Sequence, residues 1–470
     1  MTRPAPKTSG AADPAELATF LAANPQVVFF DLFYTNLSGV SRGKRLRRHE
    51  IESAYDIGRY LPGSVLVVDI TGLDIEESGM VWADGDADRS AWPVPGSLAR
   101  ALWQGDDSAS VMLAMHELDG RPCVLDPREI LRRVLARYAA DGMTPVVACE
   151  LEFYLIDATR TADGGIQPAP GPDGRRDAHP RVYGMDQLDA DAGFLRDLWA
   201  ACDAMGVPAG AAISEYAPGQ FELTLAHKPD ALAACDDAVR FKLAAKGCAA
   251  ARGQVATFMA KPYPDRSGSG LHIHVSIDDA RGANIFADPA LTGTPAMRHA
   301  VGGAADLIAD GMAIFAPNAN SYRRFRRNSY APVRAGWGLN NRTVPVRVPA
   351  GPTASRRFEH RVSGADANPY LAVAAILAGV HDGLTRRTDP GPPTVGDGYN
   401  DEAAARGGRV GERLPTDWAY AIERLARSAT LRDYLGADAV EMFATVKRVE
   451  HDRYTSVVTA LDYDWVLRSA

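Results

Sequence analysis

The sequence predicts an α+β fold in two domains. Its 470 residues, of which 46% are apolar, suffice for a large core and exceed the length of one typical domain. Predicted strands and helices do not follow the regular βαβ order of a doubly wound sheet, and no repeat of fixed period is present. Two prolines within 119–130, just before a strong helix signal, indicate the boundary. We therefore expect a disordered tail over 1–14, one domain over 15–118 and a second over 119–470.

The first domain is expected to consist mainly of short strands. Runs rich in β-branched or aromatic residues predict strands at 26–33 and 64–70, and the segment 39–46 is predicted as a further strand. The chain start lacks the apolar run of a secretory signal, and no stretch is apolar enough to span a membrane. Five scattered cysteines without CxxC spacing indicate reduced thiols, so we expect a cytoplasmic protein without a membrane partner.

The second domain is expected to mix helices and strands. Asp126 can cap a helix that begins at Pro127, and Glu129 can complete a capping box. The Gly- and Pro-rich segment 161–180 predicts an exposed loop. Further helices are predicted at 229–252, near 368–380, and over most of the chain from 416.

Four predicted strands of the second domain have one apolar face and one face of ionisable side chains. Side chains alternate along a strand, so residues i and i+2 point to the same side. For any single strand, a polar face in water is the simpler interpretation. The ionisable faces hold Glu150 and Glu152 in 146–155, Glu222 in 219–225, His272 and His274 in 268–277, and Arg357, Glu359 and Arg361 in 356–362.

If these strands are neighbours in one sheet, their acids form a site for divalent cations. Rows of glutamates repel each other unless a cation lies between them. Carboxylates with one imidazole are mostly hard oxygen donors, which suit Mg²⁺ or Mn²⁺ better than zinc. Such a number of carboxylates exceeds the needs of one magnesium ion, so we expect two or more ions. The candidate ligands are Glu150, Glu152, Glu215, Glu222, Glu359 and His272.

Arginines are concentrated between residues 323 and 361, which predicts anion binding. Nucleic acid is a poor candidate because the net charge is −8. Some of these arginines could instead form salt bridges between subunits. Clustered acids with metal ions, close to clustered arginines, are what phosphoryl transfer from a nucleotide to a carboxylate requires. A GxxxxGK[ST] phosphate loop is absent from the sequence.

Six segments together resemble the signature blocks of the glutamine synthetase superfamily, and most of all its gamma-glutamylputrescine synthetases. In chain order they are ELEF (150–153), PGQFE (218–222), KPYPDRSGSGLHIHVS (261–276), NSYRR (320–324), NNRTVPVR (340–347) and RRFEHR with ADANPYL (356–371). The resemblance implies an N-terminal β-grasp domain and a catalytic domain on a curved antiparallel sheet. It also implies a homo-oligomer, with hexameric rings that form a dodecamer and active sites between subunits.

The resemblance also assigns roles to residues. It implies that one metal ion is held by Glu152, Glu215 and Glu222, and a second by Glu150, His272 and Glu359. The implied ATP contacts are His274, Ser276, Arg347 and Arg357, and the implied glutamate contacts are Gly268, Arg324 and Arg361. Arg342 would steady the transferred phosphate, so Arg342, Arg361 and Glu359 are the implied catalytic residues.

The implied reaction has two steps: ATP phosphorylates the γ-carboxylate of glutamate, and an amine then displaces the phosphate. Ammonia-using members carry an acid where this chain has Tyr330, and another where it reads YLPGS (60–64). We therefore expect an alkylamine acceptor, putrescine or another polyamine, with Tyr330 on the amine side. Asp69, Asp74, Glu76 or Glu77 could recognise the far ammonium group, or each could be an ordinary surface acid. The alternatives are ammonia, a monoamine such as ethanolamine, and a nucleotide-binding scaffold without catalysis.

Overall fold

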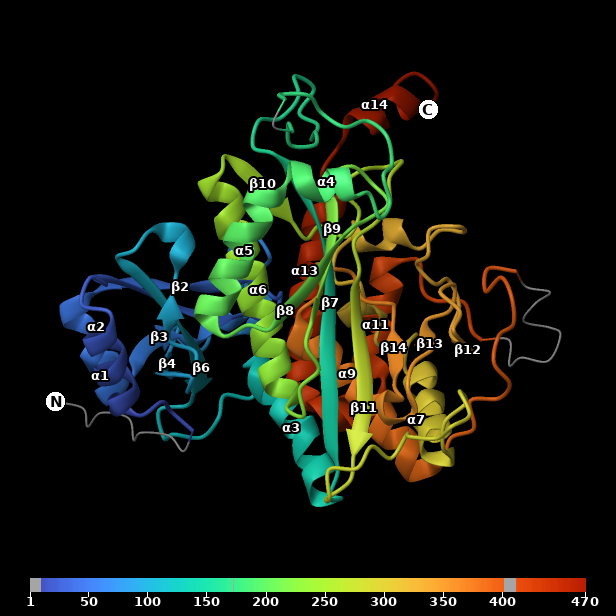
Figure 1. Ribbon diagram of the computed structural model, residues 1–470, viewed down its shortest axis with the longest axis horizontal. Helices are drawn as coiled ribbons and strands as arrows, with labels where there is room; N and C mark the ends of the chain where they lie inside the picture. Colours follow the sequence, from blue (N-terminus) through green and yellow to red (C-terminus); the bar gives the residue numbers. More distant parts are fainter. Residues whose placement is uncertain (1–9, 172, 401–410) are drawn as a thin grey trace.

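The computed structural model describes residues 10–171, 173–400 and 411–470. A smaller N-terminal sheet with helices α1 and α2 lies at one side of a larger body, whose long strands β7 and β11 run through its centre (Figure 1). This mixture of helices and largely antiparallel sheets confirms the predicted α+β class. Of the predicted tail, residues 1–9 lie outside the described residues. Ala12 is buried, its N–H donates to the carbonyl of Pro93, and α1 begins at Pro14, so ordered structure starts before residue 15.

The N-terminal sheet has the strand order β2-β1-β6-β4-β3, with β5 beside β6. β1 and β6 are parallel, and the other pairs are antiparallel. β1 and β2 confirm the strands predicted at 26–33 and 39–46, with shifted ends. The elements are α1 Pro14–Ala23, β1 Phe29–Thr35, β2 Ser41–Arg47, α2 Arg48–Asp56, β3 Arg59–Pro62, β4 Asp88–Pro93, β5 Ala99–Arg100 and β6 Ser108–His116.

The prediction of a strand at 64–70 is wrong. Residues Gly63–Leu66 form a 3₁₀ helix, and a turn follows. Leu66, Val67 and Val68 of this run are buried, but Asp69 accepts hydrogen bonds from the backbone N–H groups of Thr71, Gly72 and Leu73. A side chain that captures nearby backbone donors in this way competes with a strand ladder.

The second sheet has the order β12-β13-β14-β11-β7-β9-β8, with β10 beside β7. Its pairs are antiparallel except β12 with β13. The four strands with an ionisable face are therefore consecutive neighbours, β14-β11-β7-β9. The strands are β7 Thr144–Asp157, β8 Ala209–Ser214, β9 Gln220–Leu225, β10 Gln254–Thr257, β11 Leu271–Asp278, β12 Trp337–Leu339, β13 Val346–Val348 and β14 Phe358–His360.

Helices cover the apolar face of this sheet, where α3 and α6 contact β7 and α9 packs on both helices. The helices predicted at 229–252, near 368–380 and beyond 416 are confirmed, and 161–180 forms a loop wherever it is described. No helix of the described chain is long and apolar enough to cross a membrane. The helices are α3 Pro127–Ala140, α4 Met185–Ala190, α5 Ala192–Met205, α6 Ala231–Ala251, α7 Pro295–Asp306, α8 Met312–Phe315, α9 Pro369–Arg386, α11 Trp418–Arg427, α12 Ala429–Leu435, α13 Ala437–Thr455 and α14 Ala460–Val466.

Helix α3 begins at Pro127 and is capped by Asp126, as predicted, but it lacks the predicted capping box. The carboxylate of Asp126 accepts the N–H of Arg128 at 2.8 Å, and Pro127 is the first helical residue. Glu129 forms an ion pair with Arg132 instead of closing the expected capping box. The five cysteines, all in the described part of the chain, are buried and none is part of a disulfide.

Candidate active site

Strand register brings the ionisable side chains together. His272 on β11 lies opposite Glu150 on β7, and His274 lies opposite Glu359 on β14. On the other side of β7, Glu152 lies opposite Glu222 on β9. Alternation sends these side chains to one face, while the apolar side chains between them are buried against the helices.

Two histidines hold the central carboxylate, Glu150. His272 Nδ1 lies 2.7 Å from Glu150 Oε1, and His274 Nε2 lies 3.3 Å from Glu150 Oε2. His272 Nδ1 is also 3.6 Å from Glu359 Oε1, and its Nε2 is 3.8 Å from Glu152 Oε1. One imidazole is therefore within reach of three carboxylates.

Arginines form the wall beside Glu359, which is 1% exposed. Arg347 Nη1 donates to Glu359 Oε2 at 2.7 Å, and Arg361 Nη1 donates to Glu359 Oε1. Arg357 Nε donates to His274 Nδ1 at 3.2 Å. The Nε atoms of Arg347 and Arg361 are buried and have no hydrogen-bond partner within the described residues. The wall therefore keeps donors for an anion.

Glycines let the loop before β11 approach a buried arginine. A Cβ on Gly268 would lie 2.6 Å from Cγ of Arg324 and 2.8 Å from the carbonyl oxygen of Ala260. Gly270 donates its N–H to Glu152 Oε2 at 2.7 Å. Arg324 donates from Nη1 to the carbonyl of Val362 at 3.0 Å. The Gly-Ser-Gly loop therefore connects the carboxylates to Arg324.

Crowding changes the acidity of these carboxyl groups. Burial and the neighbouring carboxylates Glu150 and Glu152 raise the pKa of Glu222 to about 11. Burial and Glu152 raise the pKa of Glu215 to about 7. Burial alone would raise the pKa of Glu359, but Arg361 and the histidines outweigh it and lower the value to about 2. Positively charged neighbours therefore already balance the negative charge of Glu359, whereas burial and other carboxylates dominate at Glu222 and Glu215.

Residues 124–466 match the family described as glutamine synthetase, catalytic domain. The chain belongs to the glutamine synthetase family. This confirms the family expected from the six motifs, and the fold that it implies is confirmed by a solved neighbour. The structure of a GmaS–ADP complex is 30% identical, with a TM-score of 0.82 over 96% of this chain and 99% of that one.

Two curated relatives are similar over most of their length. Gamma-glutamylputrescine synthetase PuuA of Escherichia coli (strain K12) is 37% identical over 463 residues, which covers 98% of this chain and 96% of PuuA. Gamma-glutamylethanolamide synthetase GlnA4 of Streptomyces coelicolor is 32% identical over 440 residues, which covers 93% of this chain and 91% of GlnA4. Both names describe a synthetase that makes a γ-glutamyl derivative of an amine.

The carboxylate set fits the divalent cations that this family generally uses. A cation placed among Glu150, Glu152 and Glu222 would remove the repulsion that raises the pKa of Glu222. Two sets of ligand atoms lie within 4.8 Å of one another: Glu150, His274 and Glu359, and Glu150, Glu222 and His272. This grouping differs from the predicted one, because His274 lies opposite Glu359 and Glu150 belongs to both sets.

The remaining predicted residues occupy less central positions. Ser276 is buried further along β11, and Arg342 is exposed in the turn between β12 and β13. Tyr330 is 61% exposed and has a φ of +57°, a left-handed conformation that is uncommon outside glycine. These positions alone do not assign a role to Arg342 or Tyr330.

Sequence reasoning missed His227. Its ring centre lies 5.6 Å from that of His274, and burial together with His274 lowers its pKa to about 4. His227 follows the end of β9 at Leu225, so strand alternation could not assign it to a face. The nearest available signal was its position just after a strand already assigned to the site.

Proposed function

We propose that this protein is an ATP-dependent ligase that joins the γ-carboxyl group of glutamate to an alkylamine through γ-glutamyl phosphate. The observation that carries the proposal is the convergence of carboxylates, histidines and arginines from β14, β11, β7 and β9 on one face of the sheet. Membership of the glutamine synthetase family supports the same reaction class. An intact ligand set speaks against a scaffold without catalysis.

Two or more Mg²⁺ or Mn²⁺ ions would be held by Glu150, Glu152, Glu215, Glu222, His272 and Glu359. Such ions would supply positive charge to the phosphate oxygens. Arg347 and Arg361 keep Glu359 ionised and oriented, and their buried Nε–H groups provide further positive charge at the same wall. Glu359 thereby positions the donors that face the transferred phosphoryl group.

We assign the two substrates to opposite sides of these acids. We assign ATP to the side of His274, Ser276, Arg347 and Arg357, and glutamate to the side of Gly268, Arg324 and Arg361. Arg342, exposed in its turn, would steady the phosphate. The close approach of Gly268 to Arg324 supports the glutamate assignment, because only a residue without a Cβ lets the loop backbone lie directly against the buried arginine.

The proposed ligase reaction has two steps. An oxygen of the γ-carboxylate forms a bond to the γ-phosphorus of ATP while the bond to ADP breaks. The neutral amine nitrogen then attacks the acyl carbon, the carbon–oxygen bond to phosphate breaks, and the nitrogen loses a proton. Arg324 and Arg361 hold the substrate, so that the reacting carboxylate remains oriented through both steps.

An alkylamine acceptor, putrescine or another polyamine, agrees with several features. Tyr330 stands where ammonia-using members carry an acid, and an exposed aromatic side chain can cover an apolar stem. The names of PuuA and GlnA4 specify putrescine and ethanolamine as their amines. Asp69 is not available to a distant ammonium group, since it accepts from Thr71, Leu73 and Arg453.

We also propose a cytoplasmic homo-oligomer built of hexameric rings that form a dodecamer. The C-terminal helix α14 projects from the body (Figure 1). Its large apolar side chains, which include Leu461, Trp465 and Val466, are exposed, and this supports self-association. Sedimentation of the purified protein measures the number of subunits.

An amine panel tests the function. Phosphate release is measured with saturating ATP and glutamate while putrescine, other polyamines, ethanolamine, isopropylamine and ammonia are varied in turn. We expect an alkylamine, putrescine or a longer polyamine, to give the highest kcat/KM. Ammonia as the best acceptor would reject the alkylamine assignment, and glutamate- and amine-independent release would reject the ligase.

A further inference from the structure

A cavity of about 990 Å³ lies where the N-terminal sheet meets the second sheet's helices. Its walls come from the loops at 38–41 and 69–73, from α6 and β10, and from the end of α13. None of the residues assigned to metal, ATP, glutamate or amine in the proposed function lines it; Asp69, which does line it, is an amine-side candidate excluded there. The walls at 318–320 and Asp366 belong to the segments that also carry Arg324 and Arg361, so the cavity adjoins the active site without being part of it.

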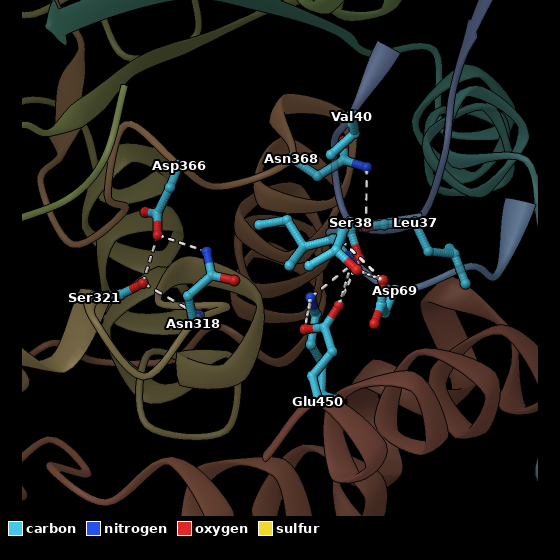
Figure 2. A network of polar contacts seen from close by, with 12 residues as sticks. Leu37, Ser38, Val40, Asp69, Asn318, Ser321, Asp366, Asn368 and Glu450 are labelled. Carbon is cyan, nitrogen blue, oxygen red and sulfur yellow. Dashed lines mark hydrogen bonds and ion pairs between the residues drawn. The ribbon is translucent and has the colours of Figure 1, made fainter. Parts of the chain in front are cut away.

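The acids along these walls already have partners (Figure 2). Asp69 Oδ2 accepts from Arg453 at 2.6 Å. Glu450 pairs with Lys447 at 2.7 Å and accepts the N–H of Ile70 at 2.8 Å. Across the cavity, Asp366 Oδ2 accepts from Asn318 and Ser321 at 2.7 and 2.6 Å. Asp366 Oδ1 is buried without a hydrogen-bond partner and attracts Lys242 electrostatically, so it is the one wall carboxylate, among the described residues, that is not fully engaged.

Two lysines of α6 carry positive charge that no ion pair within the described residues neutralises, although Asp366 attracts Lys242 from a longer distance. Lys242 and Lys246 are one helical turn apart, so they share a face of the helix, and both line the cavity. Lys242 Nζ donates to the carbonyl of Ala367 at 3.2 Å, and the two ammonium groups lie 5.4 and 5.9 Å from the centre of the Phe258 ring. Neither lysine forms an ion pair with any residue that the structure describes.

Burial is a further reason why an anion would bind favourably beside Lys242 and Lys246. It lowers the pKa of both lysines, and the charge of Lys246 helps to lower that of Lys242 to about 7. An anion between the two ammonium groups would relieve both effects. The other lining is mostly apolar, including Val239, Leu243 and Phe258. A pocket with an apolar lining and few converging polar groups is the usual form of a small-molecule site.

We infer that this cavity is a second ligand site, which binds an organic carboxylate with an apolar body. The carboxylate lies between Lys242 and Lys246, and the apolar body lies against Leu243 and Phe258. The inference rests on the cavity and its lysines, so it stands independently of the ligase assignment. An apolar amine is the opposite chemistry and would be repelled by the same pair.

Isothermal titration calorimetry of the full-length, assembled protein tests the inference with octanoate as the probe. Octan-1-ol has the same apolar body without the charge, and octylamine has the opposite charge. We expect saturable octanoate binding, with octanol weaker by about tenfold or more, since a hydrogen bond to a charged group contributes about 1.5–3 kcal/mol. Octylamine is expected to bind no better than octanol.

Variants locate the site. Lys242→Met and Lys246→Met should each weaken octanoate by about tenfold, while octanol is unaffected. Lys44→Met, which removes an exposed lysine on β2, is the matched control and should change nothing. Ala250→Trp keeps both lysines but adds bulk at an exposed lining position, and should weaken octanoate and octanol together.

Several outcomes would overturn the inference: no octanoate binding to the wild type, octylamine binding as tightly as octanoate, or unchanged affinity in both lysine variants. Thermal unfolding of each variant checks that it is folded. If Lys242→Met fails to fold, the more exposed Lys246 and Ala250 still decide the question. Octanoate affinity should also fall between about pH 6 and pH 8.5, because Lys242 loses its proton over that range.

Discussion

Replacing Glu359 by glutamine should destabilise the folded protein strongly even without any substrate. The carboxylate is 1% exposed and accepts from both Arg347 and Arg361. Its pKa falls from an ordinary 4.5 to about 2, although burial opposes the change, because Arg361, His272 and His274 favour the charged form. Since each pKa unit equals about 1.4 kcal/mol, the folded state favours the carboxylate by about 3 kcal/mol.

Glutamine keeps the shape and one acceptor oxygen but removes this charge. We therefore expect Glu359→Gln to lower the free energy of unfolding by about 3 kcal/mol at neutral pH, in the range for breaking one side of a buried ion pair. The assay is urea unfolding in the presence of a chelator, so that lost metal binding does not contribute. Glu423→Gln is the matched control: Glu423 pairs with Arg448 at the surface, where the loss should stay below about 1 kcal/mol.

The pH dependence gives a second readout. A lowered folded-state pKa contributes stability above the unfolded value and loses it as the pH falls through the folded one. The advantage of the wild type over Glu359→Gln should therefore be constant above about pH 5.5 and shrink as the pH falls from 4.5 towards about 2. A Glu359→Gln variant that unfolds no more easily than Glu423→Gln at neutral pH would refute the reasoning.

The other predictions concern the metal, the glutamate loop and the acceptor. When a chelator removes metal ions, the wild type should lose stability as the pH rises from about 4.5 to 9. The reason is that the pKa of Glu222 is raised to about 11 in the folded state, so the unfolded chain loses this proton more readily than the folded one. Mn²⁺ should reverse that loss in thermal unfolding, and Glu222→Gln should abolish the Mn²⁺ effect. Gly268→Ala should raise the KM for glutamate about tenfold or more by displacing Arg324, whereas Gly351→Ala, whose Cβ would be 3.6 Å from its nearest neighbour, should leave it unchanged. Tyr330→Glu should raise kcat/KM for ammonia relative to putrescine in steady-state assays, and an unchanged ratio would contradict its place on the amine side.

Local rules predicted which side chains of the candidate site share a strand face. Strand alternation is a property of the backbone, so the shared face of Glu150 and Glu152 could be read without any partner strand. The same rule failed at 64–70, because a short buried apolar run has the same composition in a strand and in a 3₁₀ turn. Strand alternation also could not assign His227 to a face of the sheet, because His227 lies beyond the end of β9.

By itself, the sequence determined the family, the α+β class and the side chains that share each strand face, because these follow from motifs and from contacts between near neighbours. Only the tertiary structure decided that β14, β11, β7 and β9 are adjacent, and that Glu150 belongs to two ligand sets. Strand order and register are set by contacts between residues far apart in the chain, which no local period encodes. The cavity beside Lys242 and Lys246 is hidden for the same reason, since its walls run from Ser38 to Tyr454.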